Sequence, residues 1–137
     1  MFYSTVSWLV NPIMLTGDFH EKISRRGNTH QFFSPVSVYP TSDGYVYIAV
    51  GNDRQWGTFT DFPEFSHLKK PDYEKNAGRI ADVTRLNQDI AAVTKTFTTE
   101  DIIAKFTAAT IPISKVNTME DVVADPLIKD GMLTATD

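Results

Sequence analysis

The sequence predicts an α+β fold in which a small antiparallel sheet, a hairpin plus a short strand, packs against several helices. β-Branched and aromatic residues gather over residues 36–50, where two strand-like runs flank the turn signal Thr41-Ser-Asp-Gly44. Most of the chain beyond this region has apolar residues at helical spacing, interrupted by proline and glycine. With strands few and clustered, a repeating βαβ chain is excluded.

The hairpin is expected to join strands at Val36–Pro40 and Tyr45–Val50. Pro40 has no amide donor and therefore belongs at the end of its strand, while Gly44 can take a positive φ in the turn. Alternation divides the second strand into two apolar sets, Tyr45, Tyr47 and Ala49 on one face and Val46, Ile48 and Val50 on the other. We therefore expect this strand to be covered on both faces.

The first helix after the hairpin is expected to begin at Asn52 or Asp53, either of which can cap it. It carries an aromatic set, namely Trp56, Phe59 and Phe62. Core packing is the favoured interpretation of the aromatic residues here and in the hairpin, because their spacings are those of a strand and of a helix face. Residues 61–71, which include two prolines, are expected to form a connector.

The clearest helix is expected from residue 77 or 78 to residue 97. Its apolar residues recur every three or four positions and form one stripe, made of Ile80, Val83, Leu86, Ile90, Val93 and Phe97. The charged residues fall elsewhere and predict a solvated face of Arg79, Asp82, Arg85 and Asp89. Two Thr-x-x-Asp patterns, at residues 98–101 and 118–121, predict two later helix starts on either side of a short strand at 113–116. A last turn opens at Asp125-Pro126 and closes at Gly131.

The segment Phe2–Leu15 is apolar nearly all round and has no charge before Asp18. Its spacing suits a helix kinked near Pro12. Such a helix is normally buried, either in the core of its own domain or inside a larger protein, and the missing polar face favours the second interpretation. The isolated chain is then expected to self-associate, or to leave this segment flexible.

The amino-acid composition excludes several classes of function. With 42% hydrophobic and 22% charged residues over 137 positions, the chain reads as one ordinary globular domain. Lys and Arg are never clustered beyond pairs and the net charge is −4, which argues against a nucleic-acid partner. No apolar run approaches the roughly 20 residues that span a bilayer, so no membrane partner is expected. The absence of cysteine excludes disulfides and thiol chemistry and fits a cytoplasmic location.

The search for a self-contained active site finds no catalytic residue. The three histidines share no metal-ligand spacing, so no metal is expected, and no phosphate-binding glycine loop is present. The acid pairs Asp72/Glu74 and Glu100/Asp101 sit where turns and helix starts favour acids anyway. The best candidate for a ligand contact is the loop over residues 25–31, which combines cations with Gly27, Asn28 and His30; the alternative is an exposed connector.

Several short motifs, taken in order, resemble a known family. They are Arg25-Arg-Gly-Asn28, Pro35, Asp43-Gly44 followed by YVYIAVGNDRQW, Arg79, Ile111-Pro112 with Val116, Met119-Glu-Asp-Val122, Asp125-Pro126 and Gly131-Met-Leu133. This series is similar to the family III CoA-transferases, which include formyl-CoA transferase and the carnitine and bile-acid CoA-transferases. The resemblance covers roughly residues 20 to 133, and its most specific part is the hairpin.

The resemblance implies a domain of a longer, interlocked homodimeric enzyme. Residues 1–19 would be the tail of a helix of a large Rossmann-like domain, and residues 20–137 the small inserted domain. The enzyme's substrates would be an acyl-CoA and a carboxylic acid, and no cofactor would be bound by this chain. The nucleophilic aspartate of the family lies upstream in the large domain, so this chain alone is expected to be inactive.

The resemblance also bears on specificity. The family's small domain closes over the acyl group through a loop that matches residues 27–34, which makes Gly27, Asn28 and His30 the candidate substrate contacts. That loop is glycine-rich in formyl-CoA transferase but has one glycine here, which argues against formyl or oxalyl specificity and against a lid-like loop. The related α-methylacyl-CoA racemases tend to carry a glutamate where this chain has Pro40, which favours a transferase over a racemase fragment. A stand-alone module that binds an acyl-CoA or a partner chain is the remaining alternative.

Overall fold

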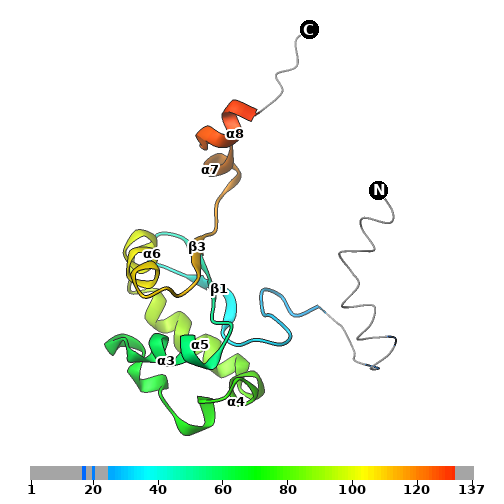
Figure 1. Ribbon diagram of the computed structural model, residues 1–137. Coiled ribbons are helices and arrows are strands. Elements are labelled where there is room, and N and C mark those ends of the chain that lie inside the picture. Colours follow the sequence, from blue (N-terminus) through cyan, green and yellow to red (C-terminus); the bar gives the residue numbers. More distant parts are fainter. Residues whose placement is uncertain (1–16, 18–19, 21–24, 132–137) are drawn as a thin grey trace.

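The structure, a computed structural model, describes residues 17, 20 and 25–131. It confirms the α+β prediction, with a three-stranded antiparallel sheet packed against helices (Figure 1). In chain order the elements are β1 (Val36–Pro40), β2 (Tyr45–Ala49), α3 (Asp53–Asp61), the 3-10 helices η1 (Pro63–Leu68) and η2 (Pro71–Tyr73), α4 (Asn76–Ala81), α5 (Val83–Thr94), α6 (Thr99–Ala108), β3 (Ile113–Lys115), α7 (Met119–Ala124) and α8 (Pro126–Gly131). The expected helix at Phe2–Leu15 lies outside the described residues.

The predicted hairpin and third strand are confirmed. β2 lies between β1 and β3, with Val38 opposite Tyr47 and Tyr47 opposite Ser114. The turn closes with a hydrogen bond from Thr41 N to Gly44 O, 2.9 Å long. Helix α5 packs on β1, and α6 packs on β2 and β3. One face of the sheet is therefore covered by helices.

The core lies between that face and the helices. It is a single cluster of buried apolar side chains, made of Tyr39, Val46, Ile48, Val50, Trp56, Phe59, Phe65, Leu68, Tyr73, Leu86, Ile90, Ile102, Phe106 and Ile111. Phe59 is central to its aromatic part, with ring centroids 4.4 Å from Phe65, 5.4 Å from Trp56 and 5.6 Å from Phe106. Aromatic pairs at these separations add to the stabilisation that burial provides.

The prediction that β2 is covered on both faces is wrong. Val46 and Ile48 are fully buried, whereas Tyr45 is 56% and Tyr47 38% exposed on the opposite face. The helices of the described chain pack on one side of the sheet only. Tyrosine suits such a face, because its ring favours strands and its hydroxyl remains hydrated.

The prediction of one long helix is also wrong, because the chain forms α4 and α5 with a break at Asp82, where φ is −114° and ψ is 28°. The break accompanies a close crossing of two backbones: a Cβ on Gly78 would lie 1.8 Å from Asp72 O. Tyr73, at the same crossing, donates a hydrogen bond to the Asp82 carboxylate. The apolar stripe therefore follows α5 but does not continue in phase through α4.

The connector between residues 61 and 71 is more ordered than the sequence predicts. It contains η1, whose Phe65 and Leu68 are fully buried, and it joins η2, which supplies Tyr73 to the core. The predicted helix starts are confirmed. Asn52 Oδ1 accepts from Gln55 N at 2.9 Å, and the hydroxyls of Thr98 and Thr118 cap α6 and α7. The first helix ends at Asp61, one residue before Phe62.

The last two helices leave the body of the molecule. Figure 1 shows α7 and α8 following β3 outward, and we call residues 117–131 the arm. Its capping box is complete, since Thr118 and Asp121 each bond the other's backbone. Met119 is 73% and Leu127 85% exposed, so the arm displays apolar side chains that the described chain leaves uncovered.

Candidate functional site

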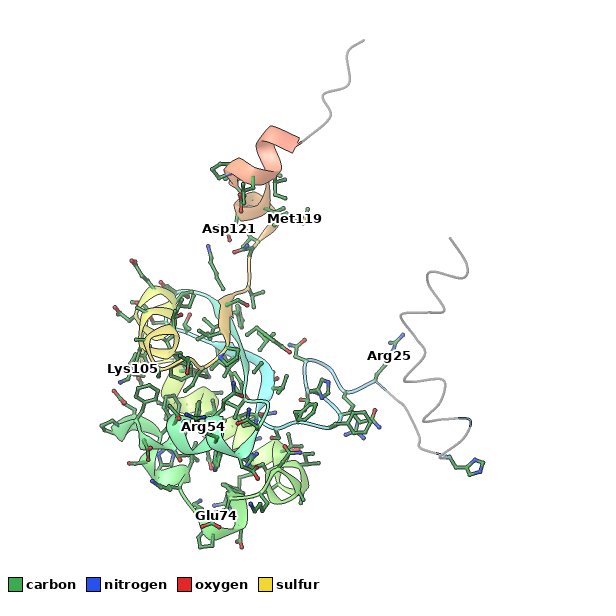
Figure 2. The ribbon with its side chains drawn as sticks, in the orientation of Figure 1. Arg25, Arg54, Glu74, Lys105, Met119 and Asp121 are labelled. Carbon is green, nitrogen blue, oxygen red and sulfur yellow. The ribbon has the colours of Figure 1, made fainter. Side chains whose placement is uncertain are left out.

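The loop over residues 25–34 leads from the outer end of the described chain to β1. Figure 2 shows Arg25 at its far end, away from the helices. Gly27 has a φ of 61°, in the left-handed region where glycine is favoured, and a hydrogen bond from Thr29 N to Arg26 O closes a turn around it. Asn28 is exposed. The structure thus places Gly27 and Asn28 at an exposed turn, with polar groups facing water.

His30 is the third predicted contact and is also exposed. Its backbone N donates to Val36 O at 3.1 Å, and its Nδ1 accepts from Phe32 N at 3.1 Å. The neutral ring therefore carries its proton on Nε2. The ring centroid lies 5.2 Å from that of Phe33. The loop accordingly joins a glycine turn, an amide and an oriented imidazole within a few residues.

The end of the loop is held by the start of α4. Asn76 Oδ1 accepts from Ser34 N at 3.0 Å, and Asn76 Nδ2 donates to Phe32 O at 2.7 Å. Arg79 Nε donates to Ser34 O at 2.7 Å. Three backbone groups of the loop end are thereby bonded to two side chains of one helix. We call Asn76 and Arg79 the clamp.

Arg79 corrects a prediction, since the sequence places it on a solvated face and the structure buries it completely. Its Nη1 donates to the carbonyls of Tyr73 and Glu74 at 2.8 and 3.1 Å. Its Nη2 donates to Asp53 Oδ1 at 2.9 Å, and this hydrogen bond is the main reason that the pKa of Asp53 is lowered. The guanidinium can be buried because each of its three nitrogens donates a hydrogen bond to a carbonyl or carboxylate oxygen.

The spacing of residues in the sequence gives no signal for the clamp. The steps of the apolar stripe are regular through α5, but nothing in the spacing indicates that Arg79 lies inside a shorter, separate helix. Asn76 has no helical or turn motif that singles it out. A polar residue that bonds a loop 42 positions away is determined by tertiary structure, which local patterns do not encode.

The hairpin turn borders a second feature, an open hollow of about 830 Å³ along α6. Asp43 Oδ1 there accepts from Thr99 N and Thr99 Oγ1, each at 2.7 Å, and from Thr41 Oγ1 at 3.1 Å. The hydrogen bond from the Thr99 hydroxyl is the main reason that the pKa of Asp43 is lowered. Lys115, also at the hollow, bonds Asp121 at 2.8 Å. Asp43 and Lys115 therefore already have partners, and Glu100 is the remaining charged residue that lines the hollow.

The other features considered as functional candidates are the acid pairs, a metal site and a membrane-spanning helix. Asp101 accepts from the Thr98 hydroxyl at the start of α6, as expected of an acid at a helix start. In the part of the chain that the structure describes, no three His, Cys, Asp or Glu side chains come together as metal ligands would. None of the helices among these residues combines the length and apolar character needed to cross a bilayer.

Comparison with known proteins identifies the family. The model for CoA-transferase family III matches residues 1–137. A succinate–glutarate CoA-transferase of Agrobacterium fabrum is 29% identical over 106 residues, which are 77% of this chain and 26% of that protein. The human succinyl-CoA:glutarate CoA-transferase is 25% identical over 111 residues, 79% of this chain and 25% of that protein. The chain therefore spans about a quarter of the length of these relatives.

Solved structures agree with this. A CAIB/BAIF family protein from Brucella suis superposes with a TM-score of 0.76 at 31% identity, over 89% of this chain and 32% of that one. A hypothetical protein from Mycobacterium tuberculosis superposes with a TM-score of 0.70 over 95% of this chain and 34% of that one. At 16% identity the second likeness is one of fold alone.

Proposed function

The chain belongs to CoA-transferase family III, and from this premise we propose that residues 20–137 form the small domain of a longer acyl-CoA:carboxylic acid CoA-transferase. Residues 1–19 are then the tail of a large-domain helix. The short span of the match to the relatives supports this division. The exposed apolar side chains of the arm and of β2 also support it, because the rest of a larger, interlocked dimer could cover them.

The proposed chemistry is covalent acyl transfer on a carboxylate outside this chain. An aspartate of the large domain attacks the acyl-CoA thioester, forming a mixed anhydride and releasing the CoA thiolate. The thiolate then attacks the aspartyl carbonyl, which frees the donor acid and leaves an aspartyl-CoA thioester. The acceptor carboxylate attacks this thioester, which releases the thiolate and forms a second mixed anhydride. The thiolate then attacks the acceptor's acyl carbon, which frees the aspartate carboxylate and completes the new acyl-CoA. The 137 residues alone are inactive because they hold no nucleophile for these steps.

The loop is proposed to contact the acyl group and the acids. The observation that supports this role best is that Gly27, Asn28 and His30 occupy an exposed loop whose end is fixed to buried structure. Asn28 can bond a carbonyl or carboxylate, and His30 Nε2 can donate to a carboxylate. A loop of this kind excludes water from reactive anhydride and thioester intermediates without taking part in bond making.

The acids are proposed to be dicarboxylic acids of the size of succinate and glutarate. The printed names of the two curated relatives support this class. In this chain Arg25 and Arg26 are exposed directly ahead of the glycine turn. A guanidinium at that position suits the carboxylate that does not react, because it can form two parallel hydrogen bonds.

Pro40 supports a transferase over a racemase. It is the last residue of β1, and its carbonyl accepts from Thr94 Oγ1 at 2.7 Å. A proline side chain can neither accept nor deliver a proton, so this position lacks the acid–base group that racemisation at a carbon needs.

The test is a CoA-transfer assay on the natural full-length protein with succinyl-CoA and glutarate, alongside the 137-residue chain. Transfer by the full-length protein and none by the chain are expected. Arg26→Gln should raise KM for glutarate about tenfold, the loss of one charge-assisted pair, while the control Arg54→Gln, an exposed arginine on α3, should not (Figure 2). Turnover by the isolated chain, or exchange of an α-proton without CoA transfer, would refute the proposal.

A further inference from the structure

We infer that Asn76 and Arg79 are positioning residues of the transferase. They hold the end of the loop so that Gly27, Asn28 and His30 are presented in one conformation. This inference rests on the proposed function of the loop. It adds that the productive loop geometry is set from α4, whose side chains bond Phe32 and Ser34 at the loop's end rather than Gly27, Asn28 or His30.

The hydrogen bonds from the clamp are concentrated on one short segment of the loop. Phe32 O, Ser34 N and Ser34 O each bond a clamp side chain, at 2.7, 3.0 and 2.7 Å. These groups lie 42 to 45 positions from their partners in the chain. Side chains that satisfy consecutive backbone groups of a loop remove its freedom at that point, because the amide and guanidinium are themselves fixed.

The clamp is itself held rigidly. Arg79 is completely buried, and its guanidinium carbon lies 5.1 Å from the centre of the Trp56 ring in the core. Asp53 Oδ1 accepts from both Arg79 Nη2 and Asn76 N, at 2.9 and 3.1 Å, so one carboxylate ties the two clamp residues together. The planar guanidinium of Arg79 donates to four acceptors and therefore has little freedom to move.

The conformation of the loop depends on how its end is held. Between Arg25 and Phe33, the backbone hydrogen bonds that hold the loop in place are few, namely Thr29 N to Arg26 O within the loop and His30 N to Val36 O at the start of β1. A short loop with few bonds of its own follows the direction set at its anchor. A misplacement of about 1 Å at a group that contacts substrate lowers turnover as much as a lost contact.

The test compares Asn76→Ala and Asn76→Asp in the natural full-length protein with a matched control. Asn76→Asp keeps an oxygen for Ser34 N but loses the donor to Phe32 O. The control is Asn87→Ala, which removes the acceptor of the buried Tyr39 hydroxyl and so costs a hydrogen bond away from the loop. Arg79→Lys is a second clamp variant, which keeps the charge but lacks the planar fork.

Two readouts are needed. Hydrogen exchange at the amides of Thr29 and His30 reports loop order, because neither amide bonds the clamp. Steady-state kinetics reports how the order of the loop affects turnover. We expect Asn76→Ala to speed this exchange and to lower kcat/KM by about 10- to 100-fold. Asn76→Asp and Arg79→Lys should give exchange rates and kcat/KM values between those of Asn76→Ala and the unchanged protein. Asn87→Ala should change neither the exchange rate nor kcat/KM beyond what its lower Tm explains.

The outcomes separate the two proposals. Unchanged exchange in Asn76→Ala would overturn the positioning role, whatever happens to activity. Faster exchange with unchanged kcat and KM would also overturn it, and would show in addition that the loop does not serve the reaction. An unchanged protein that transfers no CoA would refute the proposed function, while the exchange data would still decide whether the clamp orders the loop.

Discussion

The two ends of the β1–β2 hairpin are fastened to helices by different means. At the turn, hydroxyl groups do the fastening: Thr41 Oγ1 and Thr99 Oγ1 lie 2.8 Å apart, and both bond Asp43. At the other end, the backbone of Ser34 is held by the side chains of the clamp. The turn end of the hairpin is thus bonded to the first residue of α6, Thr99. The other end is bonded, through the loop, to the buried charge of Arg79.

The difference indicates what each end is for. The groups at the turn satisfy one another and cap α6, so the turn has a complete structural role in the fold. The clamp bonds only the last residues of its loop, and Gly27, Asn28 and His30 remain exposed beyond it. A fixed end and an exposed middle are what a substrate-contacting loop requires, because the anchor provides order without using the groups that bind.

Arg79→Ala should have the largest effect of any change at either end. It removes a buried charge that bonds four acceptors and leaves Asp53 without its main partner. Because Asp53 is 40% exposed, the loss of unfolding free energy comes chiefly from the carbonyls of Ser34 and Tyr73, which are left buried without a donor at about 1–3 kcal/mol each. Urea denaturation measures the loss. A cost below that of removing one hydroxyl at the turn would contradict the clamp's place as the stronger fastening.

Thr99→Val should have the next largest effect, and it tests the turn. Thr99 is 8% exposed, and its hydroxyl bonds Asp43 and Thr41. Valine keeps the shape but leaves the buried Thr41 hydroxyl short of a partner, and loss of that neutral hydrogen bond costs about 0.5–1.5 kcal/mol. Denaturation by urea measures this loss too, and hydrogen exchange at Thr29 and His30 should stay unchanged. Faster exchange there would mean that the two ends are not independent.

Acid should weaken the turn through Asp43. Its pKa is lowered chiefly by the Thr99 hydroxyl bond, so the folded state binds the proton less well than the unfolded chain. The resulting stability is present above the ordinary pKa of about 3.9 and is lost as pH falls through the folded value. Urea midpoints measured from neutral to acidic pH should therefore show Asp43→Asn less stable than the unchanged protein at neutral pH. The gap should close in acid. A gap independent of pH would contradict the assignment.

The sequence predicted the turn end well and the clamp end poorly, for a physical reason. Gly44, the capping threonines and the strand alternation are local signals, and all mark elements that the structure contains. The part of the loop that the structure describes was correctly predicted as an exposed segment ahead of the first strand. Arg79 was not predicted inside the core, because its burial depends on the break at Asp82 and on acceptors from three separate segments. Coverage of β2 was overestimated because alternation reports apolar character, not which face has a partner.

Ser34→Ala should have the smallest effect, and it separates the two ends most sharply. Ser34 is 1% exposed, and its hydroxyl has no hydrogen-bond partner within the described parts of the chain. Its backbone N and O carry the fastening, and alanine keeps both. Removing an unsatisfied buried hydroxyl should leave the unfolding free energy unchanged or raise it by less than about 1 kcal/mol. Urea denaturation beside Thr99→Val makes the comparison, since each variant deletes one buried hydroxyl. A loss at Ser34 equal to that at Thr99 would show that hydroxyl groups fasten both ends, and the distinction between them would fail.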